Sequence, residues 1–263
     1  MPPTYARELA FAKKIVVKAG DFIRRNRAKR SIRYKDAHLS NLVTDMDEAS
    51  EDVIVTAINR EFPDHSIVAE ERGAVGNTPY RWFIDPIDGT TNFAHGFPLW
   101  AVTVALEAHG RLVLGATYAP VLGELYWGRR GGGAWLNGRR IRVTSERRIE
   151  RALLCTGFSY KLEYRRINLK YFTEFLMTAQ AVRRCGAASL DLCWTAAGRF
   201  DGFWEMRLGP WDMAAGVVIL EEAGAKVTDF RGAPVDTSVG DFLGANPRLH
   251  RVMLGMLQKV KLD

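Results

Sequence analysis

Two aspartates three residues apart stand where an apolar strand is expected to give way to a turn. Asp85 and Asp88 follow the apolar residues 82–84, and Pro86 lacks the amide needed to continue a strand ladder. Two carboxylates about 4 Å apart repel by about 4 kcal/mol at an effective dielectric constant of 20. No lysine or arginine lies within residues 82–93, so only a proton, a distant basic residue or a metal can hold the pair together.

The residues after this pair predict a place for an anion. Gly89 permits a tight turn, and Thr90 and Thr91 are expected to begin a helix. Amides at a helix start carry partial positive charge, which favours a group such as phosphate. The segment therefore combines cation ligands with a phosphate site.

Residues 85–93, Asp-Pro-Ile-Asp-Gly-Thr-Thr-Asn-Phe, resemble the first signature of the inositol monophosphatase family of metal-dependent sugar phosphatases. The companion segments occur in the same order. Glu70-Glu71 ends an apolar stretch, residues 41–44 (Asn-Leu-Val-Thr) lead to Asp47, and residues 210–216 (Pro-Trp-Asp-Met-Ala-Ala-Gly) match the second signature. A lone Asp-x-x-Asp carries little information, whereas four ordered segments over nearly the whole chain converge on one chemistry.

The resemblance implies two or three bound Mg²⁺ ions. Mg²⁺ prefers oxygen ligands, usually one or two carboxylates together with substrate phosphate. The first ion is expected on Glu70, Asp85 and the backbone carbonyl of Ile87, and the second on Asp85, Asp88 and Asp212. One ion would activate water, the other would stabilise the leaving alkoxide, and inhibition by lithium is expected from the family.

The resemblance also implies a catalytic group and a substrate site. Thr90 is expected to orient the nucleophilic water, with Asp47 holding its proton and Glu70 acting beside them through the first ion. The expected substrate contacts are Ile87, Asp88, Gly89, Thr90, Arg183, Gly186, Ala187, Ala188, Glu205 and Asp212. Many members carry Ser or Thr where Ala187 stands, and Ser189 follows two residues later, so a hydroxyl contact there stays open.

Several of these residues have a simpler explanation when taken alone. Asp212 is typical of a helix N-cap, Asp47 of a cap or first-turn acid, and Glu70 of an exposed strand-end charge. Their ordered occurrence together favours the metal site. His95 lies close in sequence, but hard Mg²⁺ disfavours imidazole, so we do not expect it to be a ligand.

Hydrophobic periodicity predicts a mixed α/β protein with an α+β half at residues 1–145 and an α/β half at residues 146–263. Helices are expected at residues 4–25, 47–61, 164–179, 189–197 and 212–223. Strands are expected at residues 66–70, 81–85, 101–107, 112–118, 124–127, 134–136, 141–143, 152–156, 181–184, 202–205, 226–229 and 242–245. Residues 27–38 are expected to form a basic loop. The family resemblance implies a layered α-β-α-β-α sandwich with the active site between the halves.

The composition of the 263 residues is that of an ordinary globular protein, with 47% hydrophobic and 25% charged residues. An odd count of 3 Cys without a Cys-x-x-Cys motif favours reduced thiols, and the N-terminus lacks the apolar segment of a signal peptide. No apolar run approaches the roughly 18 residues that a membrane span needs. We therefore expect a cytoplasmic protein that does not bind membranes.

A net charge of +7 suits an anionic substrate. The arginines are scattered in pairs, which is more typical of solvated faces than of a nucleic-acid site. The expected partners are a small phosphate monoester and, by family resemblance, a second copy of the chain.

The expected reaction is Mg²⁺-dependent hydrolysis of a phosphate monoester, with inositol 1-phosphate as the leading substrate. Fructose 1,6-bisphosphate, histidinol phosphate and the 3′-phosphate of adenosine nucleotides are alternatives within the same superfamily. From a different class, a regulatory RNA-associated protein on this fold stays open. The spacing of Asp85 and Asp88 excludes an aspartyl-phosphate mechanism, and there is no P-loop or nucleophile elbow.

Overall fold

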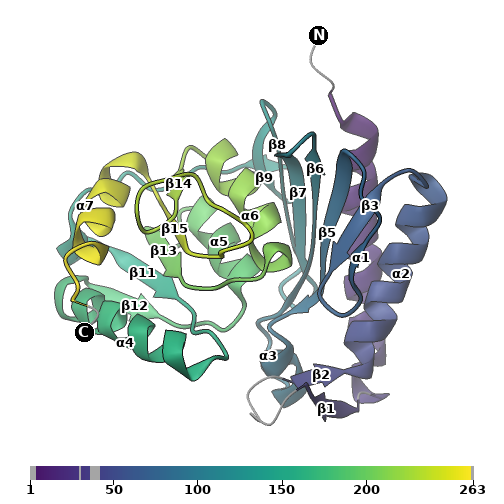
Figure 1. The fold of residues 1–263 in the computed structure, drawn as a ribbon, viewed down its shortest axis with the longest axis horizontal. Coiled ribbons are helices and arrows are strands. Elements are labelled where there is room, and N and C mark those ends of the chain that lie inside the picture. Colours follow the sequence, from purple (N-terminus) through teal and green to yellow (C-terminus); the bar gives the residue numbers. More distant parts are fainter. Residues whose placement is uncertain (1–3, 30, 36–41, 262–263) are drawn as a thin grey trace.

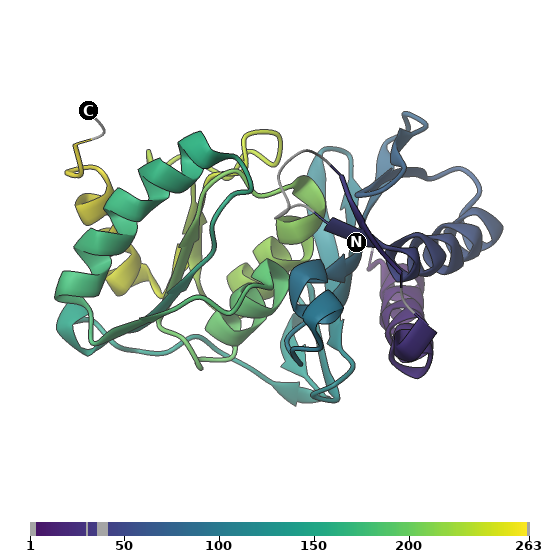
Figure 2. The same ribbon diagram turned by 90° about the horizontal axis from the view of Figure 1, so that it is seen from below.

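The computed structural model describes residues 4–29, 31–35 and 42–261, and its elements form five layers (Figure 1). The helices are α1 (Ala6–Asn26), α2 (Asp45–Glu61), α3 (Thr90–His95), α4 (Leu162–Thr178), α5 (Ala188–Ala196), α6 (Pro210–Glu222) and α7 (Pro247–Leu257), with 3₁₀ turns at Arg27–Lys29 and Ile149–Arg151. Helices α1 and α2 cover one outer face, α4 and α7 cover the other, and α5 and α6 lie between two sheets (Figure 2). The predicted mixed α/β sandwich is confirmed.

The larger sheet has eight strands in the order β10-β9-β8-β7-β6-β5-β3-β4. All its neighbours are antiparallel except the parallel pair β3 and β5. Its strands are β3 (Ser66–Ala69), β4 (Gly73–Val75), β5 (Tyr80–Asp88), β6 (Ala101–Ala108), β7 (Arg111–Ala119), β8 (Glu124–Arg129), β9 (Gly133–Leu136) and β10 (Arg139–Arg140). A separate two-stranded ribbon pairs β1 (Ile32–Tyr34) with β2 (Leu42–Thr44).

The smaller sheet has five strands in the order β12-β11-β13-β15-β14 and mixes parallel with antiparallel pairs. Its strands are β11 (Leu153–Thr156), β12 (Ala181–Arg183), β13 (Gly202–Glu205), β14 (Lys226–Thr228) and β15 (Phe242–Ala245). The two sheets thus come from successive parts of the chain, while α5 and α6 share one apolar cluster with strands of both. The division into domains at residue 145 stays a prediction.

Helix α1 forms because its apolar residues recur every three or four positions and meet the larger sheet. Leu9, Ala12, Val16 and Ile23 are buried in one cluster with Trp82 of β5. Burying a side chain of the size of valine or isoleucine contributes about 1.5–3 kcal/mol. This packing anchors the strand that carries Asp85 and Asp88.

Helix α6 is apolar on all sides, as its place between the two sheets requires, and the eight residues 213–220 are all buried. It approaches the larger sheet closely at Gly115 of β7, where an added Cβ would lie 2.5 Å from the Cα of Ala215. The absence of a side chain at Gly115 therefore sets how near α6 can lie to β7.

Strand β5 does not end before Pro86 as the sequence predicted. It continues to Asp88, and its register shifts, since Asp85 pairs with Thr103 whereas Asp88 pairs with Ala101. One extra residue on β5 makes a bulge, which accommodates the proline that has no amide to donate. The bulge places both aspartates at the end of one strand.

Other local predictions were wrong or incomplete. Residues 141–143 were predicted as a strand, but the chain pairs earlier, at β10, and no strand covers them. The predicted loop at residues 27–38 contains β1, while residues 30 and 36–38 lie outside the described part. Helix α7 was missed, although Asn246 accepts hydrogen bonds from the amides of Arg248 and Leu249, a typical N-cap before a proline.

None of the helices in the described part of the chain combines the length and apolar character that a membrane crossing requires.

We expect Gly115→Ala to lower the free energy of unfolding by about 1–3 kcal/mol, because the methyl group would press on the backbone of α6. Gly255→Ala on α7 is the control, since nothing lies within 4 Å of its added Cβ. The control should be neutral or stabilising by up to about 1 kcal/mol. Urea unfolding of both variants tests this, and equal stability of Gly115→Ala and the wild type would contradict the close contact.

Candidate active site

A cleft of about 600 Å³ is lined by residues from both parts of the chain. The end of β5, the start of α3 and Glu70 contribute from the first part. The loop after β11, the start of α5, the end of β13 and the start of α6 contribute from the second. Most of the residues singled out in the sequence therefore line one cavity.

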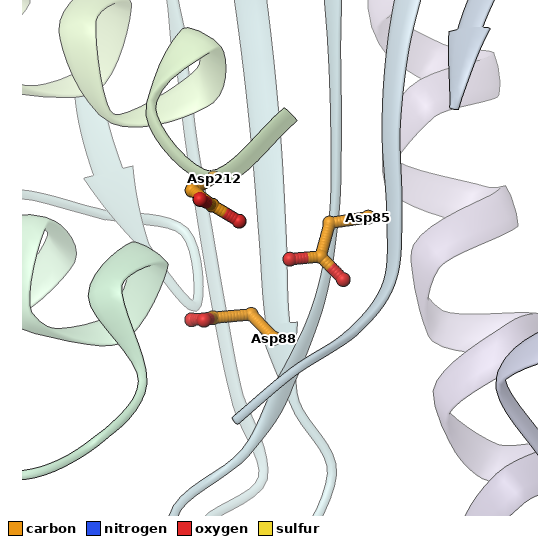
Figure 3. A group of neighbouring side chains, drawn as sticks. All are labelled: Asp85, Asp88 and Asp212. Atoms are coloured by element: carbon orange, nitrogen blue, oxygen red, sulfur yellow. The ribbon is translucent and has the colours of Figure 1, made fainter. Parts of the chain in front are cut away.

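Three aspartates form the centre of this cleft. Asp85 and Asp88 leave the end of β5, Asp212 leaves the first turn of α6, and one carboxylate oxygen of each lies within 4.8 Å of the others (Figure 3). Asp85 and Asp88 are buried, and Asp212 is partly exposed. In the described part of the chain, no lysine or arginine lies within ion-pair distance of any of them.

The electrostatics of the cluster favour bound cations. Burial raises the pKa of Asp85 well above its ordinary value, and the charges of Glu70 and Asp88 raise it further. Burial likewise raises the pKa of Asp212, with Glu70 as the next cause. Three close carboxylates without a lysine or arginine partner among the described residues are a donor set that fits a hard divalent cation. The residues present therefore suit Mg²⁺.

Backbone amides hold each carboxylate in place. Asp85 Oδ1 accepts the amide of Ile87 at 2.9 Å, and Asp212 Oδ2 accepts the amide of Gly209 at 2.7 Å. Gly209 is the N-cap residue of α6, so Asp212 occupies the third helical position rather than the cap itself. Each side chain keeps its other oxygen for the cleft.

Asp88 is held from the other part of the chain. Its Oδ2 accepts both the amide (2.7 Å) and the hydroxyl (2.5 Å) of Ser189, and its Oδ1 accepts the amide of Ala188 at 3.1 Å. The sequence left the role of Ser189 open, and the structure uses its hydroxyl to hold an aspartate. Asp88 and Ser189 are 101 positions apart in the chain, so no local signal could reveal the contact.

Glu70 lines the same cleft but is paired with a cation. The ammonium of Lys35 lies 2.9 Å from Glu70 Oε1 and 2.6 Å from Glu71 Oε1. Although burial acts in the opposite direction, these two carboxylates raise the pKa of Lys35. Sequence reasoning missed Lys35, and the basic character of residues 27–38 was its only signal.

Thr90 and Asp47 meet as the sequence led us to expect. The Thr90 hydroxyl lies 3.2 Å from Asp47 Oδ1 and 2.9 Å from the carbonyl oxygen of Ile87, so it can donate to either. Asp47 Oδ2 accepts the amide and the hydroxyl of Thr44. Burial raises the pKa of Asp47 to about 7, against the lowering effect of the Thr44 hydrogen bonds. Asn41 lies outside the described residues.

Gly89 joins the strand to α3 in a conformation that other residues rarely adopt. Its φ is 85°, and an added Cβ would lie 3.0 Å from the carbonyl oxygen of Leu99 and 3.1 Å from that of Gly186. The Asn92 amide group donates to the carbonyl oxygens of Leu99 (2.7 Å) and Cys185 (2.9 Å), another contact that the sequence did not reveal. The two parts of the chain are therefore tied together beside the cleft.

The predicted substrate contacts separate into two groups. Gly186, Ala187, Ala188 and Glu205 line the cleft together with Ile87, Asp88, Gly89, Thr90 and Asp212. Arg183 is exposed at the end of β12, and the cleft is lined by its neighbour Arg184 instead. His95 is exposed, and it is not among the described residues that line the cleft. The roles of all these residues stay predictions.

A sequence model of the inositol monophosphatase family matches residues 5–262. The chain belongs to this family. An inositol monophosphatase from Anabaena (Nostoc) sp. PCC 7120 has the same fold, with a TM-score of 0.89, 37% identity and 98% of each chain covered.

Two relatives of known sequence carry different names. The chain is 44% identical over 234 residues to the chloroplastic phosphatase IMPL1 of Arabidopsis thaliana. The match covers 86% of this chain but only 62% of IMPL1, so this chain spans less than two thirds of the length of that relative. It is 41% identical over 235 residues to the Nus factor SuhB of Pseudomonas aeruginosa, covering 87% of this chain and 86% of that one. Membership of the family makes the chain a phosphoric monoester hydrolase.

We expect the metal-free protein to lose stability as the pH rises from about 4 towards 7. Asp85, Asp212 and Asp47 have raised pKa values, so the folded state binds more protons than the unfolded state in this window. Each such group contributes a slope of up to about −1.4 kcal/mol per pH unit. MgCl₂ should therefore stabilise the protein more at pH 7.5 than at pH 5.

Urea unfolding in EDTA and in MgCl₂ at both pH values measures this difference. Asp85→Asn should flatten the pH dependence in EDTA, whereas Asp64→Asn, an exposed aspartate outside the cleft, is the control. A free energy of unfolding that rises with pH in EDTA would contradict the raised pKa values of these carboxyl groups.

Proposed function

We propose that the protein is a Mg²⁺-dependent phosphomonoesterase that hydrolyses inositol 1-phosphate or a similar polyol phosphate to the free alcohol and inorganic phosphate. The observation that carries the proposal is the cluster of Asp85, Asp88 and Asp212, close together and without a cationic partner among the described residues. The Thr90–Asp47 contact lies beside it.

The three aspartates would hold the divalent cations, with Glu70 and the carbonyl oxygen of Ile87 as further ligands. Two such cations, when bound, supply a water of lowered pKa and stabilise negative charge on the leaving oxygen. Lys35 contacts only Oε1 of Glu70, so Oε2 would be the oxygen offered to a metal.

Thr90 and Asp47 would take up the proton of the attacking water. Thr90 Oγ1 accepts a proton from the water while passing its own proton to Asp47 Oδ1. Thr44 binds the other oxygen of Asp47 and so keeps Oδ1 turned towards Thr90. A pKa of about 7 suits a group that receives a proton near neutral pH. The water oxygen bonds to phosphorus, the ester P–O bond breaks with its electron pair on the leaving oxygen, and that oxygen takes a proton from solvent water to give the alcohol.

Phosphate oxygens would lie against the amides of Gly89 and Thr90, where developing charge meets oriented donors. Glu205 lines the cleft and would accept a hydrogen bond from the alcohol. The named inositol monophosphatase among the structural relatives supports a polyol substrate. We infer a homodimer from the family resemblance. We infer a cytoplasmic location from the three free cysteines, which suit a reducing compartment.

A second candidate is a regulatory role with RNA on the same fold. The Nus factor name of a relative 41% identical in sequence favours it, together with the net charge of +7. The scattered arginine pairs speak against a dedicated nucleic-acid surface. Because the aspartate cluster is intact, a regulatory role would add to phosphatase activity rather than replace it.

The proposed function predicts Mg²⁺-dependent phosphate release from inositol 1-phosphate. A panel with fructose 1,6-bisphosphate, histidinol phosphate and adenosine 3′-phosphate compounds, measured in MgCl₂ and in EDTA, identifies the preferred substrate. Asp85→Asn should lower kcat by about 10³-fold or more, because it removes a charge from the cluster while keeping side-chain volume. Equal rates in MgCl₂ and EDTA would exclude the metal mechanism.

Thr90→Ala should lower kcat by about 10²-fold or more with little change in KM, since it removes the group that relays the proton. Thr90→Ser keeps the hydroxyl and is the matched control, with a kcat expected within about tenfold of the wild type. Steady-state kinetics at saturating Mg²⁺ measures both. A loss confined to KM would mean that Thr90 only binds substrate.

A further inference from the structure

Two acidic side chains line the cleft in addition to the aspartate cluster and Glu70. Asp191 belongs to the first turn of α5, and Glu205 ends β13. Asp191 is 1% exposed and Glu205 is 7% exposed. In the described part of the chain, neither carboxyl group has a lysine or arginine within ion-pair distance.

One oxygen of Asp191 has no partner within the protein. Asp191 Oδ1 is buried and accepts no hydrogen bond from any described residue. A buried carboxyl oxygen without a donor destabilises the folded state. The interior of the protein therefore supplies no reason for an aspartate here.

The negative charge of Asp191 acts on the carboxyl group of Glu205. Burial raises the pKa of Glu205 well above its ordinary value, and the charge of Asp191 is the next largest cause. Arg184, which lines the cleft, acts on both in the opposite direction without forming an ion pair with either. Two carboxyl groups that line one cleft at a cost in stability are typical of a binding site.

The chemistry of this pair selects its ligand. Carboxyl oxygens without internal donors are satisfied by hydroxyl groups that donate to them, and they repel a further anionic group. The phosphate of the substrate is provided for elsewhere, at the aspartate cluster and the start of α3. The part of the substrate that reaches Asp191 is therefore a neutral, hydroxyl-rich carbon skeleton.

We propose that Asp191, which lines the cleft together with Glu205, accepts a hydrogen bond from a hydroxyl group of the substrate's alcohol and so selects polyhydroxylated phosphate esters over plain ones. This inference rests on the proposed phosphomonoesterase function. It assigns Asp191 a role in specificity, whereas the aspartate cluster and Thr90 carry the reaction. A site built to bind a hydroxyl discriminates against analogues that lack it, because its polar groups are then left unpaired.

The test compares kcat/KM for inositol 1-phosphate with kcat/KM for p-nitrophenyl phosphate, which has no hydroxyl group to donate. Asp191→Ala should lower the value for inositol 1-phosphate by about 10- to 100-fold and the value for p-nitrophenyl phosphate by less than threefold. Asp191→Asn keeps the side-chain volume and should show a smaller shift of the same sign. Glu163→Gln, an exposed first-turn acid of α4, is the matched control and should leave the ratio unchanged.

Thermal unfolding separates a binding role from a structural one. Asp191→Asn should keep or raise the Tm, because it removes a carboxyl group that lacks a partner. A lowered Tm with equal loss on both substrates would overturn the inference, as would an unchanged substrate ratio in both variants. If Asp191→Ala does not fold, the ratio for Asp191→Asn decides. Failure of the wild type to release phosphate from either substrate would overturn the proposed function and this inference together.

Discussion

Mutual repulsion among buried carboxylates is the constraint on which the cleft depends. Asp85, Asp88 and Asp212 would separate if their side chains were free, because no described lysine or arginine pairs with them. The protein keeps them together by giving each a backbone donor, from Ile87, Ser189 and Gly209 respectively. These donors hold one oxygen each of Asp85 and Asp212 and both oxygens of Asp88, and a divalent cation is the species that best neutralises the remaining charge.

Asp47 and Asp212 each combine a structural role at a helix start with a proposed chemical role. Asp47 and Asp212 both occupy the third position of a helix and accept the amide of its N-cap residue, Thr44 and Gly209. The capping bond leaves Asp47 Oδ1 facing the Thr90 hydroxyl, and it leaves the carboxyl group of Asp212 in the aspartate cluster. The simple explanation of these aspartates as helix-start residues and the functional one are therefore both part of the same geometry.

The cleft depends on contacts between the two parts of the chain. Helix α6 can carry Asp212 close to β5 because Gly115 lets it approach the larger sheet. Asp88 receives its hydrogen bonds from the start of α5, and Asn92 reaches the segment before that helix. A movement of one sheet relative to the other would therefore alter the spacing of the aspartates directly.

The sequence by itself determined which residues deserve chemical interest and most of the regular elements around them. Asp-Pro-Ile-Asp-Gly-Thr and the companion segments are local patterns, and the periodicity of α1 follows from one buried face. Tertiary structure alone decided the bulge at Pro86, the pairing of Lys35 with Glu70, the use of Ser189 by Asp88 and the place of Arg184 in the cleft. Most of these features join residues far apart in the chain. Side-chain distances of that kind depend on how the layers pack, and no local pattern of hydrophobicity or charge encodes them.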